Sequence, residues 1–139
     1  MKIAVVYWSS TGNTEAMAQA VVEGAKHAGA EAELFTAAEF DGGKMDEFDA
    51  VAFGCPAMGA EELEDGEFAP MFETCESKLS GKKIALFGSY GWGDGEWMRT
   101  WEENCQDKGA NLVCDSVICQ ETPDDEALSA CRSLGEALA

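Results

Sequence analysis

The sequence has 139 residues, of which 46% are apolar, and its formal net charge at pH 7 is −18. This length is typical of one core, so we expect a single domain over residues 1–139, and the strong negative charge disfavours nucleic acid and anionic membranes as partners. No apolar run approaches the roughly 20 residues of a membrane-spanning helix and no secretory signal is recognisable, so we expect a cytoplasmic protein that does not bind membranes.

Apolar strand patterns alternate with helical patterns along the chain. Strands are expected at residues 2–8, 31–35, 49–54, 83–88 and 111–118, and helices at residues 13–28, 68–78, 96–108 and 124–138. Residues 36–48 are polar and contain glycine, which indicates a loop or a short helix. The apolar strands imply burial on both faces. We therefore predict an α/β fold with a doubly wound, five-stranded parallel sheet covered by helices on both faces.

The loop after the first strand has the composition of an anion site. It contains Ser9, Ser10, Thr11, Gly12, Asn13 and Thr14 and leads into the first helix. Backbone N–H groups at a helix start lack intrahelical partners and carry partial positive charge, so they attract a phosphate. No lysine or arginine lies in the segment, so neutral dipoles would hold the anion. An ordinary Ser/Thr-rich turn that caps the helix explains the segment equally well.

Two further loops are expected at the same edge of the sheet, where ligands bind beyond the carboxyl ends of the strands. Residues 55–66 contain Met58 beside a turn of small residues, and residues 89–95 place Trp92 between two glycines. With a phosphate cradle, these loops suit a planar aromatic ligand that has a phosphate tail. Alternatively, the glycines only shape a turn, and Met58 or Trp92 packs on the core.

These segments resemble the flavodoxin family, in its short form. Residues 9–14 match the phosphate motif (Thr/Ser)-x-Thr-Gly-x-Thr, and residues 88–95 closely match the third flavin loop. The resemblance covers the whole chain and implies the strand order 2-1-3-4-5 with flavin mononucleotide (FMN) as the cofactor. It implies a low-potential one-electron carrier, not an enzyme, that shuttles between semiquinone and hydroquinone. Such a carrier replaces ferredoxin-like carriers between redox enzymes.

The resemblance also implies which residues contact FMN. They form three groups: Ser9, Ser10, Thr11, Gly12, Asn13 and Thr14; Pro56, Ala57, Met58, Gly59, Ala60 and Glu61; and Ser89, Tyr90, Gly91, Trp92, Gly93 and Asp94. Trp92 would stack on one face of the flavin, Met58 would cover the other, and Glu61 would accept a hydrogen bond from the flavin N3–H. Pro56 departs from similar proteins that carry a hydroxyl residue there, because proline provides neither a hydroxyl nor an N–H donor.

An acidic run, Glu61, Glu62, Glu64 and Asp65, lies in the second of these loops. It is either a solvated loop or a docking surface that steers redox proteins with basic faces, such as oxidoreductases and reductases. Calcium binding is a remote third option, because the EF-hand spacing is absent. We expect a monomer, since a carrier must expose its flavin edge.

The remaining signals exclude other kinds of site. The six cysteines form no C-x-x-C pair and there is one histidine, so no metal site is predicted and most cysteines are expected to be buried apolar residues. A phospho-acceptor domain would need acidic residues where Ser9 and Ser10 stand. A flavin-binding quinone reductase or a regulatory module on the same fold is the second alternative.

Overall fold

The computed structural model describes residues 1–58, 62–91 and 93–139. In chain order its elements are β1 (Lys2–Tyr7), α1 (Asn13–His27), β2 (Glu31–Thr36), the 3-10 helix η1 (Ala37–Glu39), α2 (Gly42–Met45), β3 (Ala50–Gly54), α3 (Phe68–Cys75), the 3-10 helix η2 (Glu76–Lys78), β4 (Lys83–Tyr90), α4 (Glu96–Asp107), β5 (Asn111–Leu112), β6 (Val117–Gln120) and α5 (Asp125–Leu138). These strands pair in parallel in the order β2-β1-β3-β4-β5, and β6 also pairs with β4. The predicted fold class and strand order are confirmed.

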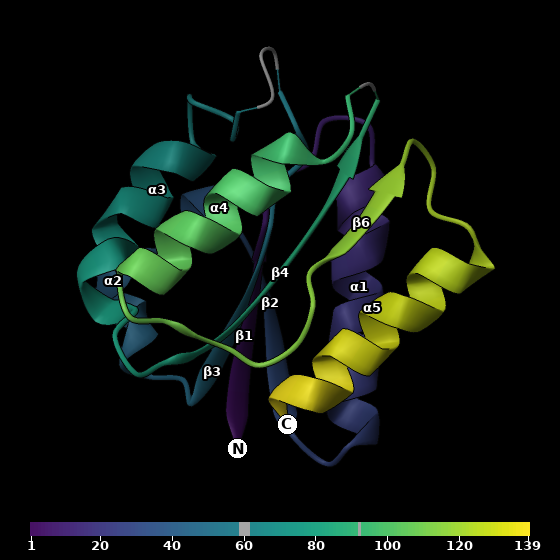
Figure 1. The fold of residues 1–139 in the computed structure, drawn as a ribbon. Coiled ribbons are helices and arrows are strands. Elements are labelled where there is room, and N and C mark those ends of the chain that lie inside the picture. The colour runs from purple at the N-terminus through teal and green to yellow at the C-terminus, as the bar shows by residue number, and fades with distance from the viewer. Residues whose placement is uncertain (59–61, 92) are drawn as a thin grey trace.

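Helices cover both faces of the sheet (Figure 1). Helices α1 and α5 pack on one face, and α3 and α4 pack on the other. Strand β1 shows the cause, because Ile3 and Val5 face the first pair of helices whereas Ala4 and Val6 face the second, and all four are fully buried. A strand whose two alternating sets of side chains are both apolar needs cover on both sides.

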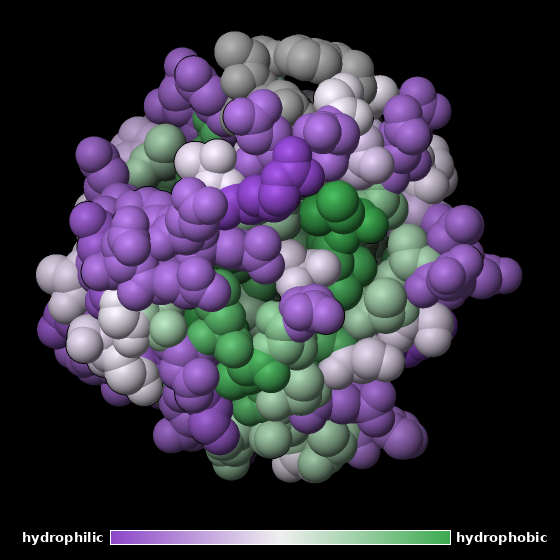
Figure 2. All heavy atoms as spheres, in the orientation of Figure 1, coloured by the Kyte–Doolittle hydropathy of each residue, from purple (hydrophilic) through white to green (hydrophobic). Residues whose placement is uncertain are grey.

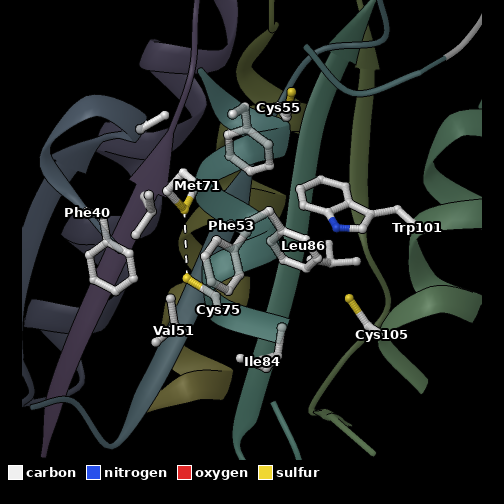
Figure 3. Packing of buried hydrophobic residues seen from close by; sticks show 14 of the residues in the cluster. Phe40, Val51, Phe53, Cys55, Met71, Cys75, Ile84, Leu86, Trp101 and Cys105 are labelled. Carbon is white, nitrogen blue, oxygen red and sulfur yellow. Dashed lines mark hydrogen bonds between the residues drawn. The ribbon is translucent and has the colours of Figure 1, made fainter. Parts of the chain in front are cut away.

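The face under α3 and α4 is packed with aromatic rings. The ring centroid of Phe53 lies 5.0 Å from that of Phe72 on α3, and the centroid of Phe68 lies 5.5 Å from that of Trp101 on α4, both edge to face. Figure 3 shows Trp101 reaching from α4 toward the strands that carry Phe53 and Leu86. Because edge-to-face contacts add to the energy of burial, this cluster ties α3 and α4 to the middle of the sheet.

The last position of the sheet differs from the prediction of one strand over residues 111–118. Leu112 pairs with Ile84 and Val117 pairs with Phe87, so four residues on the edge oppose two on β4. The two extra residues interrupt the ladder as a bulge does and divide the edge into β5 and β6. The edge strand therefore runs to Gln120 and reaches the end of β4 beside the third loop.

Other boundaries of helices and strands differ from the predicted ones by a few residues. Strand β4 continues through Ser89 and Tyr90, which were predicted to belong to a loop, and the predicted helix over residues 68–78 becomes 3-10 after Cys75. The six cysteines are free thiols, and those at positions 55, 75, 105 and 131 are buried, as expected for most of them. Among the described residues no helix is both long enough and apolar enough to cross a membrane.

Helices α1 and α5 touch through glycine. A Cβ atom placed on Gly24 would lie 1.9 Å from the carbonyl oxygen of Arg132, and one on Gly135 would lie 2.1 Å from that of Val21. Atoms cannot approach this closely without displacing the helix backbone. The two glycines therefore set how closely these helices pack.

We expect Gly24→Ala to lower the free energy of unfolding by about 2 kcal/mol, because overpacking outweighs the gain of about 1 kcal/mol that alanine brings to a helix interior. Urea unfolding measures this difference. Ser129→Ala, at an exposed site on α5, is the control and should change stability by less than about 0.5 kcal/mol. A Gly24→Ala protein more stable than the wild type would contradict the packing argument.

Candidate functional site

The first helix begins without a side-chain cap. Gly12 occupies the N-cap position with φ of 93°, a left-handed conformation that favours glycine, and it has no side chain with which to cap the first turn of α1. The hydroxyl groups serve the loop instead, since Ser9 Oγ accepts from the Gly12 N–H at 3.1 Å and Thr11 Oγ1 from the Asn13 N–H at 3.5 Å. The N-cap residue therefore contributes no side-chain cap, and the anion site stays a prediction beside the alternative of a Ser/Thr-rich turn. The uncapped first turn leaves backbone donors for an anion.

Hydrogen bonds join the three predicted loops to one another. The Trp8 N–H donates to the Gly54 carbonyl at 3.1 Å, which connects the first loop to the end of β3. The Ala57 N–H donates to the Ser89 carbonyl at 3.0 Å, and the Ser89 hydroxyl lies 2.9 Å from that of Thr14. The carboxyl ends of β1, β3 and β4 thus form one connected edge, at the top of Figure 1.

The second loop leaves β3 through a buried cysteine. The Cys55 carbonyl accepts from Trp97 Nε1 at 3.2 Å, and a Cβ atom on Gly88 would lie only 2.2 Å from that carbonyl oxygen. Burial raises the pKa of the Cys55 thiol to about 12, so the thiol is protonated at neutral pH and donates to the Pro56 carbonyl at 3.5 Å. Cys55 is therefore a structural residue and not a nucleophile.

The third loop is held from two sides. Gln120 Nε2 on β6 donates to the Gly91 carbonyl at 3.3 Å. Arg99 on α4 donates to the Asp94 carbonyl at 3.1 Å and to its carboxylate at 3.0 Å. Neither partner was among the residues predicted from the sequence. Gln120 was not predicted because it is the bulge in the edge strand that brings this residue beside Gly91.

The described site residues come together at the sheet edge as the topology requires. The first loop and α1 hold positions 9–14, the segment after β3 holds Pro56, Ala57 and Met58, and the end of β4 with the following turn holds Ser89, Tyr90, Gly91, Gly93 and Asp94. Gly59, Ala60, Glu61 and Trp92 lie outside the described residues.

Glu64 is buried, although it lies in the acidic run of the second loop that was expected to be exposed. Its side chain is 9% exposed, and its carboxylate accepts from the backbone N–H groups of Gly66 at 2.7 Å and of Glu67 and Phe68 at 2.8 Å each. Burial by itself raises the pKa of this carboxyl group, but the three hydrogen bonds outweigh burial and hold the pKa below its ordinary value. Glu62 and Asp65, in contrast, are exposed.

Comparison with known proteins decides the family. Residues 5–135 match the flavodoxin family. The chain is 45% identical to a flavodoxin of Megasphaera elsdenii over 99% of this chain and 98% of the relative, and 43% identical to one of Clostridium beijerinckii over 97% of each. The chain belongs to the flavodoxin family.

Solved structures of flavodoxins agree with this assignment. The solution structure of two-electron reduced Megasphaera elsdenii flavodoxin superposes with a TM-score of 0.90 over 98% of this chain and 97% of that chain, at 45% identity. An archaeal flavodoxin superposes with a TM-score of 0.87 over 100% and 96%, at 29% identity. The similarity extends over nearly the full length of each flavodoxin, so it includes the edge where the three loops meet.

Flavodoxins bind FMN and carry electrons at low potential between redox partners, and this chain is such a carrier, not an enzyme. The residues at the edge fit that cofactor, because an uncapped helix start and neutral hydroxyls suit a phosphate. FMN supplies the redox chemistry when bound, and the protein supplies binding, orientation and electrostatics.

The lowered pKa of Glu64 predicts how the stability of the cofactor-free protein depends on pH. Because the folded-state pKa lies below the unfolded one, the carboxylate stabilises the fold fully above its ordinary pKa and loses that contribution as pH falls through the folded pKa. The difference in free energy of unfolding between the wild type and Glu64→Gln should thus be constant near neutrality and shrink as the pH falls below the ordinary pKa of a glutamate carboxyl group.

Urea unfolding at a series of pH values measures this difference. Glu73→Gln, which changes an exposed glutamate on α3, is the control and should show a smaller pH-dependent difference from the wild type. A stability difference for Glu64→Gln that does not vary with pH would show that ionisation of this carboxyl group contributes nothing.

Proposed function

We propose that this flavodoxin holds FMN at the edge where its three loops are hydrogen-bonded together, and that it exchanges electrons with partners whose docking faces are basic. The observation that carries the proposal is that Ser89 at the end of β4 is hydrogen-bonded both to Ala57 in the second loop and to Thr14 at the start of α1. The bond from Trp8 to Gly54 joins the ends of β1 and β3 beside them. A rigid junction of this kind fixes a cofactor in one orientation, as electron transfer at a defined flavin edge requires.

The first loop and the start of α1 hold the phosphate in this proposal. Ser9, Thr11, Asn13 and Thr14 contribute side chains, and the uncapped first turn contributes backbone N–H groups. Residues 9–14 include no lysine or arginine. The phosphate is therefore held by neutral donors, and this loop adds no cation that would favour a negatively charged, reduced flavin.

The other two loops hold the ring system. Met58 and Trp92 flank its two faces, and the backbone around Gly91 and Gly93 lies at the pyrimidine end together with Glu61. Hydrogen bonds from Ala57 to β4 and from Gln120 to Gly91 support the ends of these loops. The sequence position of Trp92 between two glycines allows the backbone there to approach the ring closely.

The phosphate assignment is tested by Thr14→Val, which removes the hydroxyl and keeps the shape of the side chain. FMN should bind about tenfold more weakly, because a donor near the phosphate is lost and the buried Ser89 hydroxyl loses its partner. Riboflavin, which lacks the phosphate, should bind with a dissociation constant changed less than about threefold. Fluorescence titration of the cofactor-free protein measures both constants.

Thr100→Val, an exposed threonine on α4, is the matched control. It should leave both dissociation constants as in the wild type. Equal weakening of FMN and riboflavin by Thr14→Val would place Thr14 away from the phosphate.

The surface beside the second loop offers a docking face. A depression of about 530 Å³ lies between this loop and α4, with Leu63, Trp97 and Trp101 among its apolar lining and Glu62, Asp65, Glu103 and Asp107 among its acidic lining. Figure 2 shows hydrophilic side chains covering α4 next to it. A partner that presents lysine or arginine with long apolar stems would match both features. With a net charge of −18, copies of this chain repel one another, which supports a monomer.

Docking through these carboxylates makes electron transfer sensitive to salt. Reduction of a basic c-type cytochrome by the reduced holoprotein should slow about tenfold between low and high ionic strength, because screening removes the steering. The double variant Glu62→Gln/Asp65→Asn should be slower than the wild type at low salt and should depend less on salt. Stopped-flow absorbance measures these rates.

Glu31→Gln/Glu47→Gln is the control, because it removes the same charge from exposed positions at the amino-terminal ends of the strands. If this control slows the reaction as much as the first double variant, net charge rather than a local docking face governs the rate.

A further inference from the structure

The return limb of the second loop, which runs from Glu62 toward α3, contains the buried carboxylate of Glu64, and several hydrogen bonds converge on this residue. Glu64 Oε1 accepts from the N–H groups of Glu67 and Phe68, Oε2 accepts from that of Gly66, and the Glu64 carbonyl accepts from the Ala69 N–H at 2.9 Å. These donors lie at the start of α3, where N–H groups lack partners within the helix. One side chain thus satisfies three donors that would otherwise be left without a partner as the chain turns into the helix.

Glu64 is also hydrogen-bonded to the departing limb of the loop, which leaves β3 at Cys55. The Glu64 N–H donates to Cys55 Sγ at 3.4 Å, and the thiol of Cys55 itself donates to the Pro56 carbonyl. Two residues before Glu64, the backbones of Met58 and Glu62 exchange hydrogen bonds of 2.8 and 2.9 Å. The two limbs are therefore paired at two levels, through Cys55 and Glu64 and through Met58 and Glu62.

The two limbs differ in what holds them to the rest of the protein. The departing limb is bonded to the sheet through Cys55 and Ala57, which pair with β4. The return limb is bonded to Cys55 and Met58 on the departing limb and, through Glu64, to α3. The Glu67 carboxylate also accepts from Trp8 Nε1 at 3.1 Å, so the start of α3 connects to the first loop.

We propose that Glu64 is a positioning residue for the flavin: its buried carboxylate fixes the return limb of the second loop against α3 and so sets, through the pairing of Glu62 with Met58, where Met58 meets the ring system. This inference rests on the proposed site and goes beyond it, because Glu64 neither touches the cofactor nor belongs to the docking face. Its role differs from that of its exposed neighbours Glu62 and Asp65, although the sequence presents all three as one acidic run.

Two substitutions separate the geometry from the charge. Glu64→Gln keeps the size of the side chain and one oxygen acceptor. Its amide NH2 group replaces the other oxygen, so it must face at least one backbone N–H group that donates to the carboxylate in the wild type. Glu64→Ala removes all three acceptor contacts. Glu73→Gln is the matched control, since it makes the same change at an exposed position on α3 that belongs neither to the loop nor to the docking face. All three are compared with the wild type as full-length, cofactor-free proteins.

The readouts are the dissociation constants of FMN and riboflavin, with the absorption envelope of the bound flavin. Wild-type protein that binds FMN satisfies the proposed function, whatever the variants do. Glu64→Gln should weaken FMN and riboflavin by the same factor, about tenfold, and Glu64→Ala should weaken both further, because the ring system loses its positioned loop. The absorption envelope should shift in both variants, and Glu73→Gln should leave every readout unchanged.

Several results would overturn the inference. Folded Glu64 variants with wild-type affinity would show that the carboxylate does not position the loop. Weakening of FMN but not riboflavin would place the effect at the phosphate, and an equal effect of Glu73→Gln would assign it to charge. A role in folding alone predicts lower thermal stability with unchanged constants and an unchanged envelope.

A measurement on the wild type keeps the inference testable if both Glu64 variants fail to fold. Hydrogen–deuterium exchange of the cofactor-free protein should show slow exchange at the amides of Gly66, Glu67 and Phe68, because each donates to the buried carboxylate. Rapid exchange at Gly66 and Glu67 would mean that the carboxylate does not hold the limb before FMN binds, and the inference would be wrong.

Discussion

Ser89, the seventh residue of β4, joins the two other loops that meet at the binding edge. Its carbonyl accepts from Ala57 in the second loop, and its buried hydroxyl pairs with that of Thr14 at the start of α1. Ser89 makes both contacts because β4 lies next to β3, which leads into the second loop, and because the start of α1 lies beside the carboxyl end of β4. The geometry of the cofactor edge thus follows from the strand order, and a change in that order would separate the loops.

The two faces of the sheet are packed in different ways, and each packing serves the edge. Alanine-rich strand positions and a pair of opposed glycines let α1 and α5 lie close together on the face of the sheet from which the first loop leads into α1. Aromatic rings from α3 and α4 fill the other face. The rigid aromatic layer carries the start of α3, and the start of α3 in turn receives the Glu64 carboxylate. The aromatic packing is therefore connected to the second loop through the backbone hydrogen bonds at the start of α3.

Negative charge has two distinct uses in this protein. Exposed carboxylates such as Glu62 and Asp65 face solvent, and in the proposed function they attract basic partners at long range, an effect that salt weakens. A buried carboxylate such as Glu64 acts at hydrogen-bond distance, where burial makes its ionised form costly unless several donors satisfy it. Three backbone donors do so here. Acidic residues in one short segment therefore face solvent at some positions and hold the backbone at another.

The sequence by itself determined the fold class, the strand order implied by the family and the three loops, because apolar periodicity and the phosphate motif are local patterns. It did not separate Glu64 from its acidic neighbours, and it missed Gln120 and Trp97 as supports of the loops. It also read the edge strand as continuous. These features depend on contacts between residues far apart in the chain. Burial, hydrogen-bond partners and strand register exist only once the sheet has brought those residues together, so only the tertiary structure decided them.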